Sequence, residues 1–364
     1  MSSIAIFLTY LHGGGVERVL VNLMRGFVEQ GLSVDLVLVR AEGSFLSLIP
    51  PEVRIVELGA TRLIQSIPAL IRYLKENRPA ALLSAMEDIN VVALWSRAIS
   101  GVSTRLVVSV HSTLSREAQN STQLKRRIAP TLARWFYPWA DAVVTVSQGS
   151  ADDLVHLGFS AERIRVIYNP VVTPELFEKV TEPLNHPWFE AGSPPVILSV
   201  GRLAKEKDFT TLIRSFAHVQ QQRRVRLIIL GEGKERTHLE ALVQQLGIEE
   251  HVALPGFVSN PYAYMAKAAV FVLSSLFEGL PTALIEAMAA GTQLVSTDCE
   301  SGPAEILANG RYGKLVAVGD VKGMAEAILS TLDTPLDSEV LRQRGAEFSL
   351  EKAVAQYRQV LHVE

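Results

Sequence analysis

The sequence of 364 residues carries 48% apolar and 20% charged residues, which is typical of well-packed globular domains and excludes a disordered chain. At this length we expect two domains of about 180 residues each. The formal net charge of −3 gives no support for a nucleic-acid binder, and the single cysteine, Cys299, excludes an intramolecular disulfide.

The first half of the chain alternates between apolar strands and amphipathic helices. Residues 4–10 predict a strand, and a glycine loop then leads into a helix at 16–30. Further strands are predicted at 34–39, 53–58, 81–84, 105–110, 142–146 and 164–167, with a helix at 67–76. This repeating pattern predicts a parallel sheet covered by helices.

A Pro-rich stretch without clear periodicity then separates the two halves, and the alternation restarts after it. Strands are predicted at 196–200, 226–230, 252–254, 270–273, 293–296 and 314–316, and helices at 209–222, 234–246, 261–268, 282–290 and 350–361. The fold class is therefore α/β, with two Rossmann-like halves. We expect domains at residues 1–172 and 196–347, a linker at 173–195, and a final segment at 348–364.

No segment of the sequence predicts a membrane span. The apolar run at 4–11 is short and lacks a preceding basic residue, so a strand is a better interpretation than a signal peptide. The longest later apolar run, 268–277, falls well short of the roughly 20 residues that a spanning helix needs. We expect a cytoplasmic protein, either soluble or peripheral at the inner face of the membrane.

Unusual polar and glycine residues follow the predicted strands, where parallel sheets bind ligands. They are Gly14 and Gly15 after the first strand, His111, Arg202 and Lys207, the segment before Val258, and Glu278 with the residues after it. Each also has a plain structural interpretation. The glycines fit a tight turn, His111 fits a hydrogen-bonded structural histidine, and Arg202 and Lys207 fit surface charges. Their repeated placement at strand ends favours a ligand site.

The most informative segment runs from Glu278 to Glu286. Gly279 and Leu280 precede a strong helix former, with Pro281 where helices favour proline, so their backbone N–H groups predict an anion site. Glu278 and Glu286 bracket this site, although a simple phosphate site would avoid carboxylates. A ligand with hydroxyl groups on both sides of its phosphates, such as a nucleotide sugar, fits this combination.

Taken together, these residues resemble the retaining GT-B glycosyltransferases of the family 4 (group 1) type, in the branch that builds bacterial surface or lipid-linked glycans. The resemblance covers nearly the whole chain, and its most specific element is the Glu-x7-Glu pair of Glu278 and Glu286. It implies two Rossmann-like domains facing a central cleft, with the acceptor side in the first domain, the donor side in the second, and a final helix that crosses back.

The resemblance also implies roles for the residues at matching positions. Glu278 contacts the donor sugar, Glu286 binds the ribose, and Arg202 and Lys207 hold the diphosphate with the help of Gly279, Leu280 and Pro281. His111 lies over the donor sugar near the reacting carbon. The loop of Gly14 and Gly15 approaches the diphosphate and the acceptor, and the backbone near Val258 meets the base.

The implied reaction transfers a hexose or an N-acetylhexosamine from a nucleotide diphosphate sugar, for which we expect UDP, to a glycan or polyprenyl-diphosphate-linked acceptor. Arg202, Lys207 and backbone N–H groups would stabilise the departing diphosphate, so we expect neither a metal nor another cofactor. No carboxylate is clearly placed as a covalent nucleophile, which favours a same-face substitution with retention.

A basic segment joined to aromatic residues suggests contact with an anionic membrane surface, through Lys125, Arg126, Arg127 and Trp135. The alternative is a partly buried helix with solvated arginines. Two alternative functions also remain at this point. One is a UDP-N-acetylhexosamine 2-epimerase of the same architecture, and the other is a nucleotide-sugar-binding protein without catalytic activity.

Overall fold

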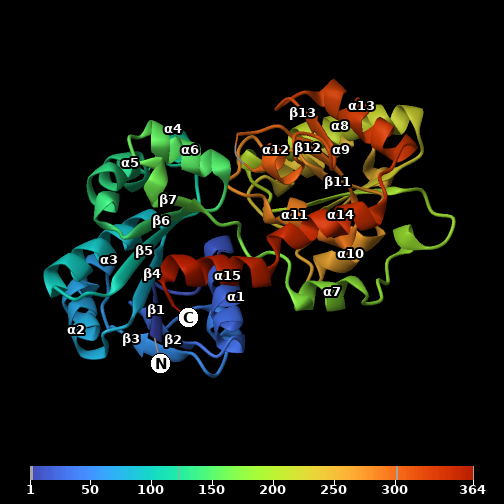
Figure 1. The fold of residues 1–364 in the computed structure, drawn as a ribbon. Helices are drawn as coiled ribbons and strands as arrows, with labels where there is room; N and C mark the ends of the chain where they lie inside the picture. The colour runs from blue at the N-terminus through green and yellow to red at the C-terminus, as the bar shows by residue number, and fades with distance from the viewer. Residues whose placement is uncertain (1–2, 122, 301, 364) are drawn as a thin grey trace. The chain divides into compact units, whose positions relative to one another are not determined.

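The computed structural model describes residues 3–121, 123–300 and 302–363, and the chain divides into two compact units (Figure 1). Unit 1 comprises Met1–Pro170 and Leu350–Glu364, and unit 2 comprises Val171–Ser349. The stretch expected as a linker, 173–195, belongs to unit 2 and contains helix α7 (Pro174–Val180).

Unit 1 is built on a seven-stranded parallel sheet. Its strands, in spatial order, are β3 (Arg54–Glu57), β2 (Ser33–Leu38), β1 (Ser3–Leu8), β4 (Ala81–Ala85), β5 (Arg105–Val110), β6 (Ala142–Thr145) and β7 (Ile164–Val166). Its helices are α1 (Gly15–Glu29), α2 (Ile67–Asn77), α3 (Glu87–Ser100), α4 (Leu114–Asn120), α5 (Leu124–Phe136), α6 (Gln148–His156) and α15 (Leu350–Leu361). Because the central strands are buried on both faces, they are almost wholly apolar.

Unit 2 is built on a six-stranded parallel sheet. Its strands, in spatial order, are β10 (Val252–Gly256), β9 (Arg226–Leu230), β8 (Val196–Val200), β11 (Val270–Leu273), β12 (Gln293–Thr297) and β13 (Lys314–Val316). Besides α7 its helices are α8 (Phe209–Gln222), α9 (Arg236–Leu246), α10 (Pro261–Lys267), α11 (Thr282–Ala290), α12 (Pro303–Ile306), α13 (Val321–Asp333) and α14 (Ser338–Gly345). The predicted α/β class with two parallel, helix-covered sheets is thereby confirmed.

Several helices were not predicted from the sequence, among them α3, α6, α13 and α14. The helix α3 is buried on most of its surface, from Ile89 to Leu94, so its sequence lacks the single apolar stripe that marks an amphipathic helix. The helix α14 is short and mostly polar, which leaves little periodicity to read.

The last helix, α15, is part of the core of unit 1 and packs beside α1 (Figure 1). The close approach depends on Gly26 of α1, where an added Cβ would lie 2.4 Å from Val354 Cγ2 and 3.2 Å from Leu350 Cδ1. A glycine inside a helix normally costs stability, so Gly26 serves packing rather than helix formation.

The variant Gly26→Ala should therefore destabilise unit 1. Overpacking should cost about 1–3 kcal/mol, and the higher helix propensity of alanine should offset up to about 1 kcal/mol of that cost. The double variant Gly26→Ala with Val354→Ala should recover part of that loss, because the clashing methyl group is gone. Urea unfolding followed by tryptophan fluorescence measures both. Additive losses in the double variant would contradict the proposed contact.

Candidate active site

The strand order of unit 2 reverses between β8 and β11. The chain continues from β8 to β9 on one side, and from β11 to β12 on the other. The segments that leave these two strands diverge, and parallel sheets bind ligands in the crevice formed at such a point. Arg202 and Lys207 follow β8, and Glu278 follows β11, so the fold brings these three predicted residues to the same place.

Lys207 and Glu278 form an ion pair at this point. Lys207 Nζ lies 2.5 Å from Glu278 Oε1, and the side chains are only 23% and 12% exposed. The Ser275 hydroxyl donates to the same carboxylate oxygen at 2.6 Å. The backbone is fixed as well, because the Ser274 hydroxyl donates to the carbonyl of Lys207 at 2.7 Å. The pair therefore joins the loops that follow β8 and β11.

Arg202 forms an ion pair with Glu206 in the same loop, and its side chain is largely exposed. Burial acts to raise the pKa of Glu206, but hydrogen bonds from its own backbone and from Arg202, with the charges of Arg202 and Lys207, hold that pKa below its usual range. The carbonyl of Glu206 accepts a hydrogen bond from Leu276 N at 2.8 Å. Both predicted phosphate-binding cations are thus held by carboxylates in this structure.

The turn of Gly279, Leu280 and Pro281 leads directly into α11, as the sequence predicts. Pro281 is the N-cap residue, and its carbonyl accepts from Leu284 N at 3.1 Å, so the helix begins without a side-chain cap. Gly302, at φ +96°, packs on this turn, where an added Cβ would lie 2.5 Å from Pro281 Cδ. The positive end of the α11 dipole therefore points into the region of the Lys207–Glu278 pair.

The remaining donor-side candidates lie farther along the same edge. Glu286 is on α11, and the Tyr262 hydroxyl of α10 donates to its Oε1 at 3.5 Å. Val258 lies just past β10, two strands from β8, and is partly buried beside the exposed Phe257.

Two glycines hold the loops of this edge together. A Cβ on Gly231, at φ +138°, would lie 2.0 Å from the carbonyl oxygen of Gly201, and a Cβ on Gly233 would lie 2.2 Å from that of Leu203. Both glycines follow β9. Their physical role is to let the loop after β9 lie directly against the backbone of the loop that carries Arg202.

In unit 1 the glycine loop follows β1, and Gly15 begins α1. The buried carboxylate of Glu17 accepts hydrogen bonds from Gly13 N at 2.6 Å and Gly14 N at 3.2 Å. Glu17 thus occupies the N–H groups of the loop that, from the resemblance, was expected to approach the diphosphate and the acceptor.

His111 follows β5 in unit 1, and burial lowers its pKa to about 4. The Nε2 atom lies 3.0 Å from Ser109 Oγ, which in turn lies 3.3 Å from the hydroxyl of Tyr357 on α15. Among the described residues, His111 Nδ1 is buried without a hydrogen-bond partner. The histidine is therefore neutral near pH 7, oriented from one side, and open for a bond on the other.

The basic segment forms the helix α5. Arg126 pairs with Glu117 of α4 at 2.6 Å, and Arg127 is exposed. Trp135 is 64% exposed, whereas the side chain of Lys125 lies outside the described residues. Leu124 and Ile128 are also exposed, at spacings that put them on the same helix face as Trp135.

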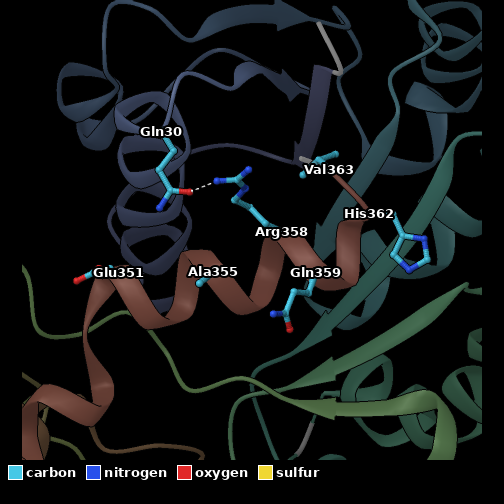
Figure 2. Close-up of a pocket in the computed structure, with 7 residues that line it drawn as sticks. All are labelled: Gln30, Glu351, Ala355, Arg358, Gln359, His362 and Val363. Carbon is cyan, nitrogen blue, oxygen red and sulfur yellow. Dashed lines mark hydrogen bonds between the residues drawn. The ribbon is translucent and has the colours of Figure 1, made fainter.

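Of the cavities lined by described residues of unit 1, two bear on the argument. The larger, of about 650 Å³, lies along α15 at the end of α1, where Gln30 Oε1 accepts from Arg358 Nη1 at 2.7 Å (Figure 2). The helix α1 starts at the carboxyl edge of the sheet, where ligands bind, and ends beside Gln30. This cavity therefore lies at the opposite edge of the sheet. The smaller cavity, of about 270 Å³, is lined by His111, by Val16 after the glycine loop, and by Glu87.

The sequence did not single out Glu17, Glu87, Ser109 or Tyr357 as parts of the site. Glu87 begins α3 directly after β4, so the rule that ligands bind beyond strand ends could have found it. Tyr357 carries no such signal, because it reaches the site from a helix 248 positions away in sequence. In the part of the chain that the structure describes, no cluster of three metal-ligating residues occurs, and no helix is long and apolar enough to cross a bilayer.

Comparison with known proteins gives matches along both units. Residues 13–174 match the family described as Glycosyltransferase Family 4, and residues 182–348 match Glycosyl transferases group 1. Two curated relatives come from Campylobacter jejuni. The first is N-acetylgalactosamine-N,N'-diacetylbacillosaminyl-diphospho-undecaprenol 4-alpha-N-acetylgalactosaminyltransferase, 32% identical over 94% of this chain and 92% of the relative.

The second relative is GalNAc-alpha-(1->4)-GalNAc-alpha-(1->3)-diNAcBac-PP-undecaprenol alpha-1,4-N-acetyl-D-galactosaminyltransferase, 28% identical over 90% of this chain and 88% of its own length. Among solved structures, Anabaena HepE in complex with UDP and glucose superposes with a TM-score of 0.78, at 21% identity, with full coverage of both chains.

The two parallel-sheet units define the class of GT-B glycosyltransferases. The chain belongs to glycosyltransferase family 4, of the group 1 type, and the resemblance found in its sequence is confirmed.

The lowered pKa of His111 predicts an acid-sensitive stability. The unfolded chain takes up a proton at this residue near its ordinary pKa of 6.5, whereas the folded protein takes it up only near pH 4. Stability from this group is therefore complete above pH 6.5 and is lost as the pH falls towards 4. When the pH is lowered from 7 to 5, the free energy of unfolding should fall by up to about 2 kcal/mol more in wild type than in His111→Gln.

Urea unfolding at both pH values, followed by tryptophan fluorescence, tests this expectation, because Trp95, Trp135 and Trp139 all lie in unit 1. The exposed His218 on α8 gives the matched control, and His218→Gln should behave as wild type. An equal loss of stability in wild type and His111→Gln would count against the lowered pKa of His111.

Proposed function

We propose that this glycosyltransferase moves a hexose or an N-acetylhexosamine from a UDP-linked donor to the sugar of a polyprenyl-diphosphate-linked or lipopolysaccharide acceptor, with retention and without a metal. The observation that carries the donor half of this proposal is the Lys207–Glu278 pair, which lies where the strand order of unit 2 reverses and next to the beginning of α11.

The donor would bind by exchanging partners with these residues. A diphosphate is a stronger partner for Lys207 and Arg202 than a single carboxylate is, and the start of α11 adds backbone N–H groups. Once Lys207 turns to the phosphate, Glu278 is released to accept hydrogen bonds from the hydroxyls of the donor sugar. Glu286, which is farther along α11, would take the ribose hydroxyls in the same way, with Val258 beside the base.

The same groups would carry the chemistry. Cleavage of the bond between the anomeric carbon and the phosphate oxygen leaves negative charge on the departing UDP, which Lys207, Arg202 and the helix N-terminus stabilise. The leaving phosphate takes the proton of the attacking acceptor hydroxyl as the new bond forms on the same face. His111 is neutral and would donate or accept a hydrogen bond at the reacting sugar without adding charge there.

The acceptor class rests on the relatives. Both Campylobacter enzymes are named for transfer of N-acetylgalactosamine to undecaprenol-diphosphate-linked sugars, with an alpha linkage in the product. An alpha-linked nucleotide donor gives such a product with retention. The relatives match over 88% or more of their own length, which supports an acceptor of the same kind for this chain.

The variant Glu286→Ala should lose the stabilisation that a UDP-sugar gives to wild type. Saturation at 100 times the Kd raises stability by about 2.7 kcal/mol, and removing a charged hydrogen-bond acceptor should weaken binding on the order of 10- to 100-fold. Thermal melting with UDP-glucose, UDP-N-acetylgalactosamine, GDP-mannose and ADP-glucose measures the effect and the base preference. The exposed Glu326 on α13 provides the control variant, Glu326→Ala.

A full UDP-sugar shift in Glu286→Ala would contradict the ribose role. The absence of a shift with every donor in wild type would contradict the transferase assignment of this site. Release of an epimerised UDP-sugar without an acceptor would favour the epimerase alternative, and donor binding without turnover would favour an inactive binder.

The acceptor class also calls for contact with a membrane, and α5 offers a surface for it. Leu124, Ile128 and Trp135 form an exposed apolar stripe, at 71%, 42% and 64% exposure, and Arg127 lies beside it. An amphipathic helix of this kind inserts its apolar face among headgroups while arginines meet anionic lipid. Arg126 contributes less, because Glu117 already neutralises it.

Replacing Leu124, Ile128 and Trp135 by serine should lower the fraction that pellets with phosphatidylglycerol-containing vesicles several-fold, because the inserting surface is removed. Arg127→Glu should lower it mainly at low salt, since screening weakens the charge contribution. Phe257→Ser, which changes an exposed apolar residue of unit 2, is the control. Unchanged pelleting of the triple variant would rule out this surface.

A further inference from the structure

The cavity beside His111 is assembled from four separate parts of unit 1. Glu87 begins α3 after β4, and His111 and Ser112 follow β5. Leu114 and Glu117 come from α4, Arg126 and Ala129 from α5, and Val16 from the first turn of α1. Its volume of about 270 Å³ is just below the range of about 300–1,000 Å³ of pockets for drug-sized ligands, so it suits a single sugar ring.

The backbone that presents Glu87 is strained and firmly held. Met86 adopts φ +77°, which is costly for a side chain of this kind. The buried Asn90 supports the turn: its Nδ2 donates to the carbonyl of Ser109 at 3.1 Å and to Tyr137 Oη at 3.0 Å, and its Oδ1 accepts from the Ser84 hydroxyl at 2.8 Å. The backbone position of Glu87 is therefore fixed by the sheet and by α3.

The polar groups of the cavity suit hydroxyl groups of a ligand. Ser112 Oγ donates to Glu87 Oε1 at 3.1 Å, which leaves further lone pairs of the carboxylate for a ligand. Burial, with the nearby carboxylates of Glu117 and Asp88, raises the pKa of Glu87. Among the described residues, His111 Nδ1 is buried without a partner, and an unpaired buried polar atom of this kind costs stability until a ligand satisfies it.

The charge of the cavity argues against a phosphate. Glu87, Asp88 and Glu117 line it, and Arg126, the cation among its described lining residues, is already paired with Glu117. A diphosphate would be repelled, whereas a neutral sugar ring would find carboxylate acceptors and the apolar surface of Val16, Leu114 and Ala129 for its C–H face. The sugar end of a lipid-linked acceptor fits this cavity, and its diphosphate end does not.

We propose that this cavity binds the terminal sugar ring of the acceptor and that Glu87 accepts a hydrogen bond from one of its non-reacting hydroxyl groups, which makes Glu87 a determinant of acceptor specificity. The inference rests on the proposed transferase function and adds to it the place and the polar partner of the acceptor sugar.

Two-substrate kinetics of Glu87→Gln test the proposal. The substitution keeps the size of the side chain but removes its charge and one acceptor position. We expect the KM for the acceptor to rise at least tenfold, while the KM for the donor and the Kd of UDP stay within twofold of wild type. Glu76→Gln, an exposed carboxylate on α2 of the same unit, is the matched control.

Monodeoxy analogues of the acceptor identify the contact. With methyl α-N-acetylgalactosaminide as the probe, the penalty of Glu87→Gln should vanish for one analogue that lacks a non-reacting hydroxyl. The same assay with an undecaprenyl-diphosphate-linked N-acetylgalactosamine separates recognition of the sugar from recognition of the lipid. The ratio of the acceptor KM in Glu87→Gln to that in wild type should be equal for the methyl glycoside and the lipid-linked sugar.

An unchanged acceptor KM in Glu87→Gln, or an equal rise in the donor KM, would overturn the proposal. If wild type transfers no sugar to either probe, the proposed function fails. The cavity is then judged by saturation-transfer NMR of the methyl glycoside with UDP-loaded protein, where loss of signal in Glu87→Gln supports the site and an unaltered signal overturns it. Ser112→Ala, with a smaller rise in acceptor KM, covers the case in which Glu87→Gln does not fold.

Discussion

The common direction of the strands in each of the two parallel sheets is the constraint on which the rest of the molecule depends. Every strand of a sheet ends at the same edge, so each loop after a strand is delivered to one side of its unit. In unit 1 the strand order reverses between β1 and β4, and in unit 2 between β8 and β11. The glycine loop and Glu87 mark the first of these points, and Lys207 and Glu278 mark the second.

Within unit 2, the cations and carboxylates of the candidate site are paired with one another in the absence of a ligand. Lys207 is only 23% exposed and would be costly to leave unpaired, and Glu278 neutralises it. The exposed Arg202 is paired with Glu206. A diphosphate must therefore compete with carboxylates that are already in place. This competition favours a ligand that also donates new hydrogen bonds to the displaced carboxylate. Sugar hydroxyls near Glu278 would do so. The presence of acidic residues in an anion site, which looks contradictory in the sequence, follows from this exchange.

The sequence was sufficient for the parts that rest on local patterns. Apolar runs predicted the strands, and the turn from Gly279 to Pro281 predicted the beginning of α11. It was insufficient where a residue acts through contacts made by the whole fold. Nothing local distinguishes Gly233, whose role is set by a carbonyl of another loop, or Glu17, which occupies the glycine loop that was expected to face a phosphate. The helix α3 was missed because burial on most sides removes the amphipathic stripe.

The last helix shows how a residue without any motif becomes part of the site. Five residues of α15, Leu350, Ala353, Val354, Tyr357 and Leu361, are buried in the core of unit 1, and Gly26 of α1 makes room for Leu350 and Val354. The hydroxyl of Tyr357 then reaches Ser109, whose own hydroxyl meets His111 Nε2. Among the described residues, His111 is held through Nε2, and its Nδ1 has no hydrogen-bond partner. The end of the chain therefore does more than complete the core, since Tyr357 supports the serine that orients His111.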